Sequence, residues 1–389
     1  MYSVLNRRVS FSLLIVIIVM FSSYKADSKC EFKAVFNFGD SNSDTGGFWA
    51  AFPAQSGPWG MTYFKKPVGR ASDGRLIIDF LAESLGMPFL SPYLQSIGSD
   101  FRHGANFATL ASTVLLPNTS LFVSGISPFS LAIQLNQMKD FKVRVDEFHS
   151  SQQPGLHILP PSNIFGKSLY TFYIGQNDFT SNLASIGVDG VKQYLPQVIG
   201  QIAGTIKVVL WMKEIYGIGG RTFLVLNLAP VGCYPAILTG YPHTMSDLDK
   251  FGCLIPVNNA VKYYNMLLDK ALSETRTVLK NATVIYLDTH KILLDLFQHP
   301  KSYGMKYGIK ACCGYGGRSY NFNQKLFCGT TKIIGNSSAT AKACRDPKNY
   351  VSWDGIHATE AANRRISTAI LDGSISYPPF ALNHLCPSV

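Results

Sequence analysis

The sequence has few charged residues and no long run of a single charge. Asp, Glu, Lys and Arg make up 15% of the 389 residues, whereas hydrophobic residues make up 47%. A chain of this composition can bury a large core, which excludes disorder as its main state. The formal net charge is +11, but no block of Lys and Arg typical of nucleic-acid binding is present. We therefore expect no nucleic-acid partner. The basic charge is interpreted as a surface property that would suit contact with acidic cell-wall polysaccharide.

No apolar run that could cross a membrane follows the N-terminal segment. Residues 1–28 have the pattern of a secretory signal, because Arg7 and Arg8 precede the apolar stretch 11–21, which is short for a membrane span. We expect cleavage near residues 26–28; an uncleaved anchor is the alternative. Repeats, low-complexity tracts and linkers are also missing, so a single domain is predicted over residues 29–389. The predicted location is extracellular, in the apoplast or cell wall, with the vacuole as a further possible destination.

Cysteine pairs with the CxxC spacing of zinc sites do not occur, and no metal site is predicted. All eight cysteines follow the predicted signal, and six of them lie after residue 250. In an oxidising compartment they can form up to four disulfides, whose pairing the sequence leaves open. Segment 312–350 is rich in Cys, Gly and Asn and is predicted to be a disulfide-tied loop. Sequons at Asn118, Asn281 and Asn336 indicate a glycoprotein.

Short apolar runs alternate with longer segments of helical periodicity. The runs predict strands and the periodic segments predict helices. The predicted strands are 34–38, 168–174, 222–228 and 283–288, and the predicted helices are 76–85, 131–145, 191–216, 258–279 and 360–371. Strands that are apolar throughout favour a parallel sheet covered on both faces. The predicted fold class is therefore α/β.

The first predicted strand ends in a Gly-Asp-Ser turn that contains Ser41. Open α/β proteins place their chemistry at this edge of the sheet, although an ordinary polar turn has the same composition. A serine nucleophile needs a base, and the most informative candidate is His357, which follows Asp354 by three residues before the last helix. Asp288 and His290 form a rival pair.

Two further positions could donate hydrogen bonds to an oxyanion. Gly104 lies next to His103 in a stretch of small residues, and no side chain hinders approach to its N–H. Asn177 offers a side-chain amide just after the strand 168–174. Each residue also has a structural interpretation, Gly104 as a packing glycine and Asn177 as a turn former.

Four blocks occur in a fixed order: Gly39-Asp40-Ser41, the Gly104 block Gly-Ala-Asn-Phe-Ala, Gly175-Gln-Asn177-Asp178 and Asp354-Gly-Ile-His357. They resemble the four blocks of the GDSL (SGNH) hydrolase family, and the resemblance runs from about residue 35 to the end. The chain is most similar to plant GDSL esterase/lipases, in the branch of early-nodulin-like and acetylajmalan or lanatoside acetylesterase-like proteins. The resemblance implies a three-layer α/β/α sandwich with a parallel central sheet.

The resemblance also implies a role for each candidate residue. Ser41 would be the nucleophile, and Asp354 and His357 would complete the triad. The N–H groups of Ser41 and Gly104 and the side chain of Asn177 would form the oxyanion hole. No cofactor is implied.

The function implied is that of a secreted serine esterase with an acyl-enzyme on Ser41. Short acyl groups, above all acetyl, on a small molecule or a glycan are favoured over lipid esters. Acyl transfer by the same triad, a fucosidase-like activity that needs two carboxylates and a non-catalytic wall protein are alternatives. Tyr173 and Ala358 stand where this branch often has Asp and Tyr, and they are expected to alter the substrate pocket. Trp49 and Trp59 are expected to form its walls.

Overall fold

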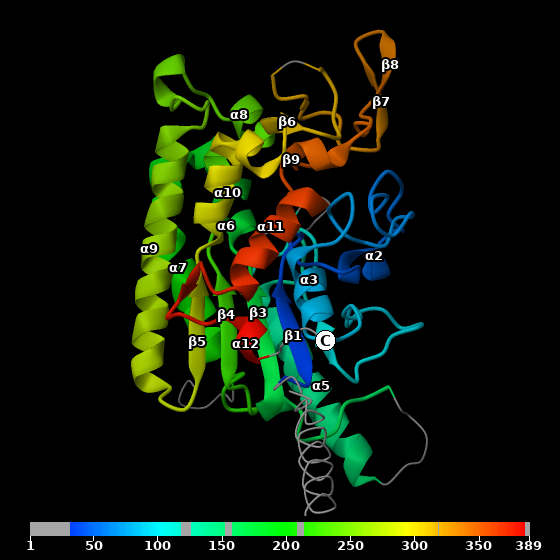
Figure 1. Cartoon of the computed structure of the whole chain (residues 1–389), viewed down its shortest axis with the longest axis vertical. Helices are drawn as coiled ribbons and strands as arrows, with labels where there is room; N and C mark the ends of the chain where they lie inside the picture. The colour runs from blue at the N-terminus through cyan, green and yellow to red at the C-terminus, as the bar shows by residue number, and fades with distance from the viewer. Residues whose placement is uncertain (1–31, 118–125, 152–157, 208–213, 318, 386–389) are drawn as a thin grey trace, which may run out of the picture.

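The computed structural model of the chain describes residues 32–117, 126–151, 158–207, 214–317 and 319–385 (Figure 1). The predicted signal, Cys30, Cys386 and Asn118 lie outside these residues. The main sheet has the strand order β10-β5-β4-β3-β1-β2. Its strands are β1 (Ala34–Gly39), β2 (Gly104–Asn106), β3 (Ser168–Tyr173), β4 (Thr222–Leu226), β5 (Thr283–Leu287) and β10 (Ser376–Tyr377).

The predicted sheet is confirmed with one exception at its edge. The first five strands run parallel to one another, but β10 pairs with β5 in the antiparallel direction. The short strands β2 and β10 were not predicted, because neither contains the continuous apolar run that identified the other four. All six residues of β1 and of β3 are buried, which accounts for their mostly apolar sequence. The polar Asn37 and Thr171 are paired across the two strands, where the Thr171 hydroxyl donates to the Asn37 Oδ1 at 2.7 Å.

Helices cover both faces of this sheet (Figure 1). One group consists of α5 (Leu131–Ser150), α7 (Leu183–Ile206) and α9 (Ile255–Val278), in which α7 contacts both other helices. The other consists of α3 (Ile77–Ser84), α10 (Thr289–Gln298), α11 (Glu360–Leu371) and α12 (Leu382–Leu385), in which α11 contacts the other three. The short helices α2 (Gly47–Ala51), α6 (Gln176–Ser181) and α8 (Pro235–Gly240) follow strand ends or turns. The layered fold agrees with the predicted α/β/α sandwich. Within the described ranges, no helix is both long and apolar enough to cross a membrane.

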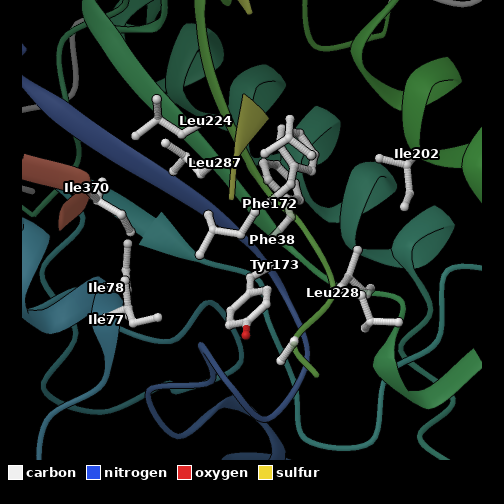
Figure 2. Packing of buried hydrophobic residues seen from close by; sticks show 14 of the residues in the cluster. Phe38, Ile77, Ile78, Phe172, Tyr173, Ile202, Leu224, Leu228, Leu287 and Ile370 are labelled. Carbon is white, nitrogen blue, oxygen red and sulfur yellow. The ribbon is translucent and has the colours of Figure 1, made fainter. Parts of the chain in front are cut away.

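The core is continuous across the sheet. Figure 2 shows Ile77 of α3 and Ile370 of α11 on one side of the strands, and Ile202 of α7 on the other. Between them the rings of Phe38 and Phe172 stack with their centroids 5.0 Å apart. This packing fixes the register of β1 against β3, in which Gly39 lies opposite Tyr173. The turns that follow the two strands therefore lie side by side at one edge of the sheet.

The cysteine-rich segment contains regular structure that the sequence did not indicate. Strands β7 (Thr331–Ile334) and β8 (Ser337–Thr340) form a hairpin that projects from the top of the molecule in Figure 1. The flanking strands β6 (Tyr307–Ala311) and β9 (Tyr350–Ser352) pair in parallel. Disulfides join Cys312 to Cys344 and Cys313 to Cys328, so the segment is tied as predicted; a third disulfide joins Cys233 to Cys253.

Candidate active site

Ser41 lies in a tight turn at the carboxyl end of β1, between β3 and β2. Gly39 permits this turn, because a Cβ at that position would lie 2.2 Å from the Ser43 Oγ and 2.7 Å from the Tyr173 carbonyl oxygen. Asp40 stabilises the turn as expected, since its Oδ1 accepts hydrogen bonds from the backbone and side-chain nitrogens of Asn42, both at 2.9 Å. Only 3% of the Ser41 surface is exposed.

The structure brings His357 and Asp354 to Ser41, across 316 residues of sequence. The Ser41 Oγ lies 2.7 Å from the His357 Nε2, and the His357 Nδ1 lies 2.7 Å from the Asp354 Oδ2. The Asp354 Oδ1 accepts the backbone N–H groups of Ile356 and His357 at 2.9 and 2.8 Å. Both oxygens of this carboxylate are therefore committed, which fixes the orientation of the imidazole.

Burial and charge oppose each other in this pair. Burial alone would lower the pKa of His357, but the charge of Asp354 and its hydrogen bond raise that pKa above its ordinary value of 6.5. Burial alone would likewise raise the pKa of Asp354, but the charge of His357 and the hydrogen bonds lower it below 3.8. An ionised carboxylate thus holds the proton on Nδ1, and the Nε2 of the neutral ring is left to accept the Ser41 proton.

Asn177 lies beside the turn that carries Ser41, in the first turn of α6, which follows β3. Its Nδ2 donates to the carbonyl oxygen of Ser112 at 2.8 Å, which leaves the second amide hydrogen. The neighbouring Gln176 Oε1 lies 3.3 Å from the Asn42 Nδ2. The structure therefore places Asn177 and Ser41 in adjacent turns at the same sheet edge.

Gly104 does not lie in this site. It is the first residue of β2 and pairs with Val35, near the start of β1. Gly39 lies four residue steps beyond Val35 along β1, which at about 3.3 Å per step amounts to about 13 Å of strand. A Cβ on Gly104 would lie 1.8 Å from the Val35 carbonyl oxygen. The prediction of an oxyanion role for Gly104 is wrong, and its interpretation as a packing glycine agrees with the structure.

The loop after β2, not its first residue, reaches the site. The Leu110 N–H donates to the Asp44 Oδ2 at 2.8 Å, and the Val114 N–H donates to the Asp178 Oδ2 at 2.7 Å. Between these anchors Ala111 has a left-handed backbone with φ of 63°. Across the described ranges, neither the Ala111 N–H nor the Ser41 N–H has a hydrogen-bond acceptor. Because β2 is parallel to β1, only the residues that follow β2 can reach the edge of Ser41. Recognising 104–106 as a strand would have identified this loop from sequence.

Asp44 and Asp178 are functional neighbours whose role the sequence did not reveal. Asp44 accepts four backbone N–H groups, from Gly46, Gly47, Phe48 and Leu110. Burial raises the pKa of Asp44 to about 6 and that of Asp178 to about 7, although their hydrogen bonds oppose the shift. Both carboxylates fasten the loop after β2 to the turns that carry Ser41 and Asn177.

The aromatic residues take different positions. The Trp59 ring lies 6.5 Å from the His357 ring, edge to face, so Trp59 flanks the site as expected. Trp49 instead lines a separate cavity of about 510 Å³ next to Gly46. A small enclosed cavity of about 10 Å³ adjoins His357, and both Tyr173 and Ala358 line it.

The remaining histidine candidates are not in contact with Ser41. His103 is exposed, at the opposite edge of the sheet, with its Nδ1 3.2 Å from the Lys33 carbonyl oxygen. His290 is buried and has no hydrogen bond to Asp288, so the rival pair does not form. Among the described residues no group of His, Cys, Asp and Glu could hold a metal ion.

The chain matches the family model of the GDSL-like Lipase/Acylhydrolase over residues 35–370. It is 85% identical over 386 residues to the GDSL esterase/lipase At4g01130 of Arabidopsis thaliana, covering 99% of this chain and 100% of that protein. Its identity to the GDSL esterase/lipase At3g26430 of the same plant is 45% over 359 residues, covering 92% and 93%. Its identity to Alpha-L-fucosidase 3 of that plant is 43% over 347 residues, covering 89% and 91%.

Proposed function

Because the chain belongs to the GDSL-like lipase/acylhydrolase family and is a hydrolase of ester bonds, we propose that it works through an acyl-enzyme on Ser41. The observation that supports this most strongly is the continuous hydrogen-bond chain from Ser41 through His357 to Asp354, with both heavy-atom distances at 2.7 Å. This is the arrangement that activates a hydroxyl nucleophile.

The proposed reaction has two halves. The Ser41 Oγ attacks the ester carbonyl carbon while the His357 Nε2 takes the hydroxyl proton, and the carbonyl electron pair moves onto the oxygen. The tetrahedral intermediate then expels the alcohol, which receives the proton from His357. In the second half, water attacks the acyl-enzyme with His357 again as base. Collapse releases the acid and restores Ser41, so one ester and one water give one acid and one alcohol.

Three donors are proposed to stabilise the oxyanion. They are the N–H of Ser41, the remaining amide hydrogen of Asn177 and the N–H of Ala111, which takes the place first assigned to Gly104. The supporting observations are the adjacent turns, the lack of acceptors for the two N–H groups within the described chain and the left-handed Ala111 backbone. Preorganised donors of this kind supply much of the catalysis in acyl transfer.

A short acyl group, with acetyl favoured, is proposed for the substrate. The enclosed cavity beside His357 has a volume of about 10 Å³, with Ile77, Ile356 and Ile366 among the residues that line it. A cavity needs about 10–15 Å³ to hold a single water, so this space favours the smallest acyl group, and a longer chain requires a larger displacement of the walls. Tyr173 and Ala358, the two departures from the plant-esterase pattern, both line this cavity.

Secretion is proposed from the signal pattern of residues 1–28, and glycosylation is proposed from the sequons. The exposed positions of Asn281 and Asn336 support their use as glycan acceptors. A secreted basic chain would also associate with acidic wall polysaccharide. The alcohol part of the substrate is proposed to be a small molecule or a glycan.

The test compares Ser41→Ala with Ser43→Ala. The two serines lie two residues apart in one turn and are equally buried at 3% exposure, but among the described residues the Ser43 Oγ has no hydrogen-bond partner. On p-nitrophenyl acetate, Ser41→Ala should lose turnover and labelling by a fluorophosphonate probe, whereas Ser43→Ala should retain both. Undiminished turnover in Ser41→Ala would refute the proposal. The acetate ester should also turn over faster than the butyrate and palmitate esters; a preference for palmitate would indicate a lipase pocket.

Two other activities, glycoside hydrolysis and acyl transfer, can each be tested separately. A relative that is 43% identical bears the name Alpha-L-fucosidase 3, so hydrolysis of an aryl fucoside that survives Ser41→Ala would favour a glycosidase that uses two carboxylates. Acyl transfer requires only that an alcohol replaces water in the second half-reaction. Adding glycerol and measuring the ratio of glycerol ester to free acid distinguishes transfer from hydrolysis.

A further inference from the structure

Another cavity, of about 390 Å³, lies at the carboxyl ends of β4 and β5. Helix α9 forms one wall through Lys262 and Asp269, and β10 contributes Tyr377. None of the residues that line this cavity lines the small cavity beside His357. It is therefore separate from the proposed ester site, although it opens at the same edge of the sheet.

His290 supplies the first indication of a ligand. Its side chain lines this cavity, only 8% of the residue is exposed, and within the described part of the chain its Nε2 has no hydrogen-bond partner. Burial lowers the pKa of His290 to about 4, despite the opposing charge of Asp288. The ring is therefore neutral near pH 7, where its nitrogens can both donate and accept. Buried polar atoms in folded proteins are almost always paired, so an unpaired one that borders a cavity calls for an occupant.

Asn227 organises the polar wall. Its Nδ2 donates to the Tyr286 hydroxyl at 2.7 Å and to the Asp288 Oδ1 at 2.8 Å, and its Oδ1 accepts the His290 N–H at 2.9 Å. This network fixes three residues in place without using all of their hydrogen-bonding capacity. In the described chain the Asp288 Oδ2 accepts no hydrogen bond and the Tyr286 hydroxyl donates none.

An aromatic surface stands beside this wall. Tyr377 is 47% exposed, and its ring centroid lies 6.4 Å from that of Tyr286. A rigid ring with one apolar face and a polar edge suits an amphipathic ligand. Lys262 and Asp269, which also line the cavity, have opposite charges, so among the described residues the carboxylate of Asp288 is the one lining charge that they leave unbalanced.

We propose that this cavity is a carbohydrate-binding site, in which a pyranose unit stacks on Tyr377 and hydrogen-bonds through its hydroxyls to Asp288, His290 and Tyr286. The volume falls within the about 300–1,000 Å³ that small-molecule sites commonly have. A sugar combines an apolar C–H face with several hydroxyls that donate and accept, which matches one aromatic surface beside three partly free polar groups. The site would hold a glycan near the ester site without contacting the reacting atoms.

The test uses the mature Ser41→Ala protein, in which binding is measured without turnover. The probes are the methyl glycosides of glucose, galactose and xylose and the tetrasaccharide cellotetraose, followed by saturation-transfer NMR and calorimetry. At least one probe should bind with a Kd of about 0.1–5 mM. Added Tyr377→Ala and His290→Phe substitutions should each raise that Kd at least about tenfold, which corresponds to 1.4 kcal/mol.

Tyr63→Ala is the matched control, since Tyr63 is a similarly exposed tyrosine, at 41%, that does not line the cavity. It should leave the Kd unchanged. Thermal unfolding of each variant verifies the fold, and Tyr377→Ala retains the test if His290→Phe does not fold. Absence of binding by every probe, or equal binding in the Tyr377 variant, would overturn the inference. So would displacement of a bound sugar by tetramethylammonium, which would indicate a cation site.

Discussion

Replacing Asp354 with Asn tests the triad most directly, because the structure dictates how the amide must lie. The Asp354 Oδ1 accepts two backbone N–H groups, from Ile356 and His357. In Asp354→Asn only the amide oxygen can accept these bonds, so the NH₂ group must face the His357 Nδ1. A ring nitrogen that receives a hydrogen bond cannot carry a proton. The proton therefore moves to Nε2, and His357 can no longer accept the proton of Ser41.

The expected loss is large and has a pH signature. The same substitution in a Ser-His-Asp triad lowers kcat by about 10⁴, which corresponds to about 5 kcal/mol of transition-state stabilisation. Activity requires neutral His357, so kcat/KM rises with pH through the His357 pKa. Asp354 raises that pKa above 6.5, while burial lowers it. Removal of the carboxylate charge should therefore shift the rising limb of the profile to lower pH.

The assay measures kcat/KM on p-nitrophenyl acetate from pH 4 to 9. Asp295→Asn is the matched control, because Asp295 makes the same carboxylate contact to a histidine Nδ1, at 2.8 Å to His299, on the surface of the molecule. Asp295→Asn should change neither kcat/KM nor the pH at which kcat/KM rises. If Asp354→Asn lowered kcat/KM by less than about tenfold and left the rising part of the pH profile unshifted, Asp354 would not orient His357, and the reasoning would be refuted.

Three further substitutions separate the remaining roles. Asn177→Ala should lower kcat by about 10²–10³ with little change in KM; steady-state rates check this, and a change in KM alone would contradict an oxyanion role. Gly104→Ala should lower Tm but not the kcat of the folded fraction, since its Cβ would lie 1.8 Å from a backbone oxygen; calorimetry with active-site titration checks it. Burial raises the pKa of Asp40 from 3.8 to about 6, so the ionised form destabilises the folded state increasingly from pH 4 to 6 and fully above it. The difference in unfolding free energy between Asp40→Asn and the wild type should therefore be about 3 kcal/mol more in favour of the variant at pH 8 than at pH 4. Urea unfolding checks this, and an equal difference at both pH values would count against it.

The sequence predicted those elements whose pattern depends on burial. Ala34–Gly39 and Ser168–Tyr173 are buried on both faces of the sheet, and a strand in that position is mostly apolar. Helix Glu360–Leu371 was also predicted with its observed bounds. The strands Gly104–Asn106 and Ser376–Tyr377 have only three and two residues. Segments of this length show no periodicity, and neighbouring strands decide their conformation.

The site was predictable where a residue type coincided with a position at a strand end or helix start. Ser41 and Asn177 follow strand ends and His357 precedes the last helix, and the structure brings Ser41 and His357 into contact. The prediction for Gly104 failed because a pattern of small residues does not show whether the glycine is needed as a hydrogen-bond donor or for close strand packing. That distinction depends on the direction of the strand, which only the pairing with Val35 reveals. The anchors Asp44 and Asp178 were missed because their partners are backbone N–H groups, which leave no signal in sequence.

The vicinal cysteines explain how a turn near the end of the chain can hold its position against Ser41. The Cys312 N–H donates to the Ser352 carbonyl oxygen at 3.0 Å, and the Cys313 N–H donates to that of Trp353 at 2.6 Å; the Trp353 N–H in turn donates to the His357 carbonyl oxygen at 2.7 Å. Because each cysteine has a separate disulfide partner, the segment directly after β6 that carries these donors is fixed at two points.

Closing a contact between residues 316 positions apart has a substantial entropic cost, and a loosely held turn would also lose the 2.7 Å geometry that proton transfer requires. Each disulfide restricts the freedom of the unfolded segment, which stabilises the folded state by about 2–4 kcal/mol for loops of ordinary length. The cysteine-rich segment therefore supports the turn that carries His357, the proposed base.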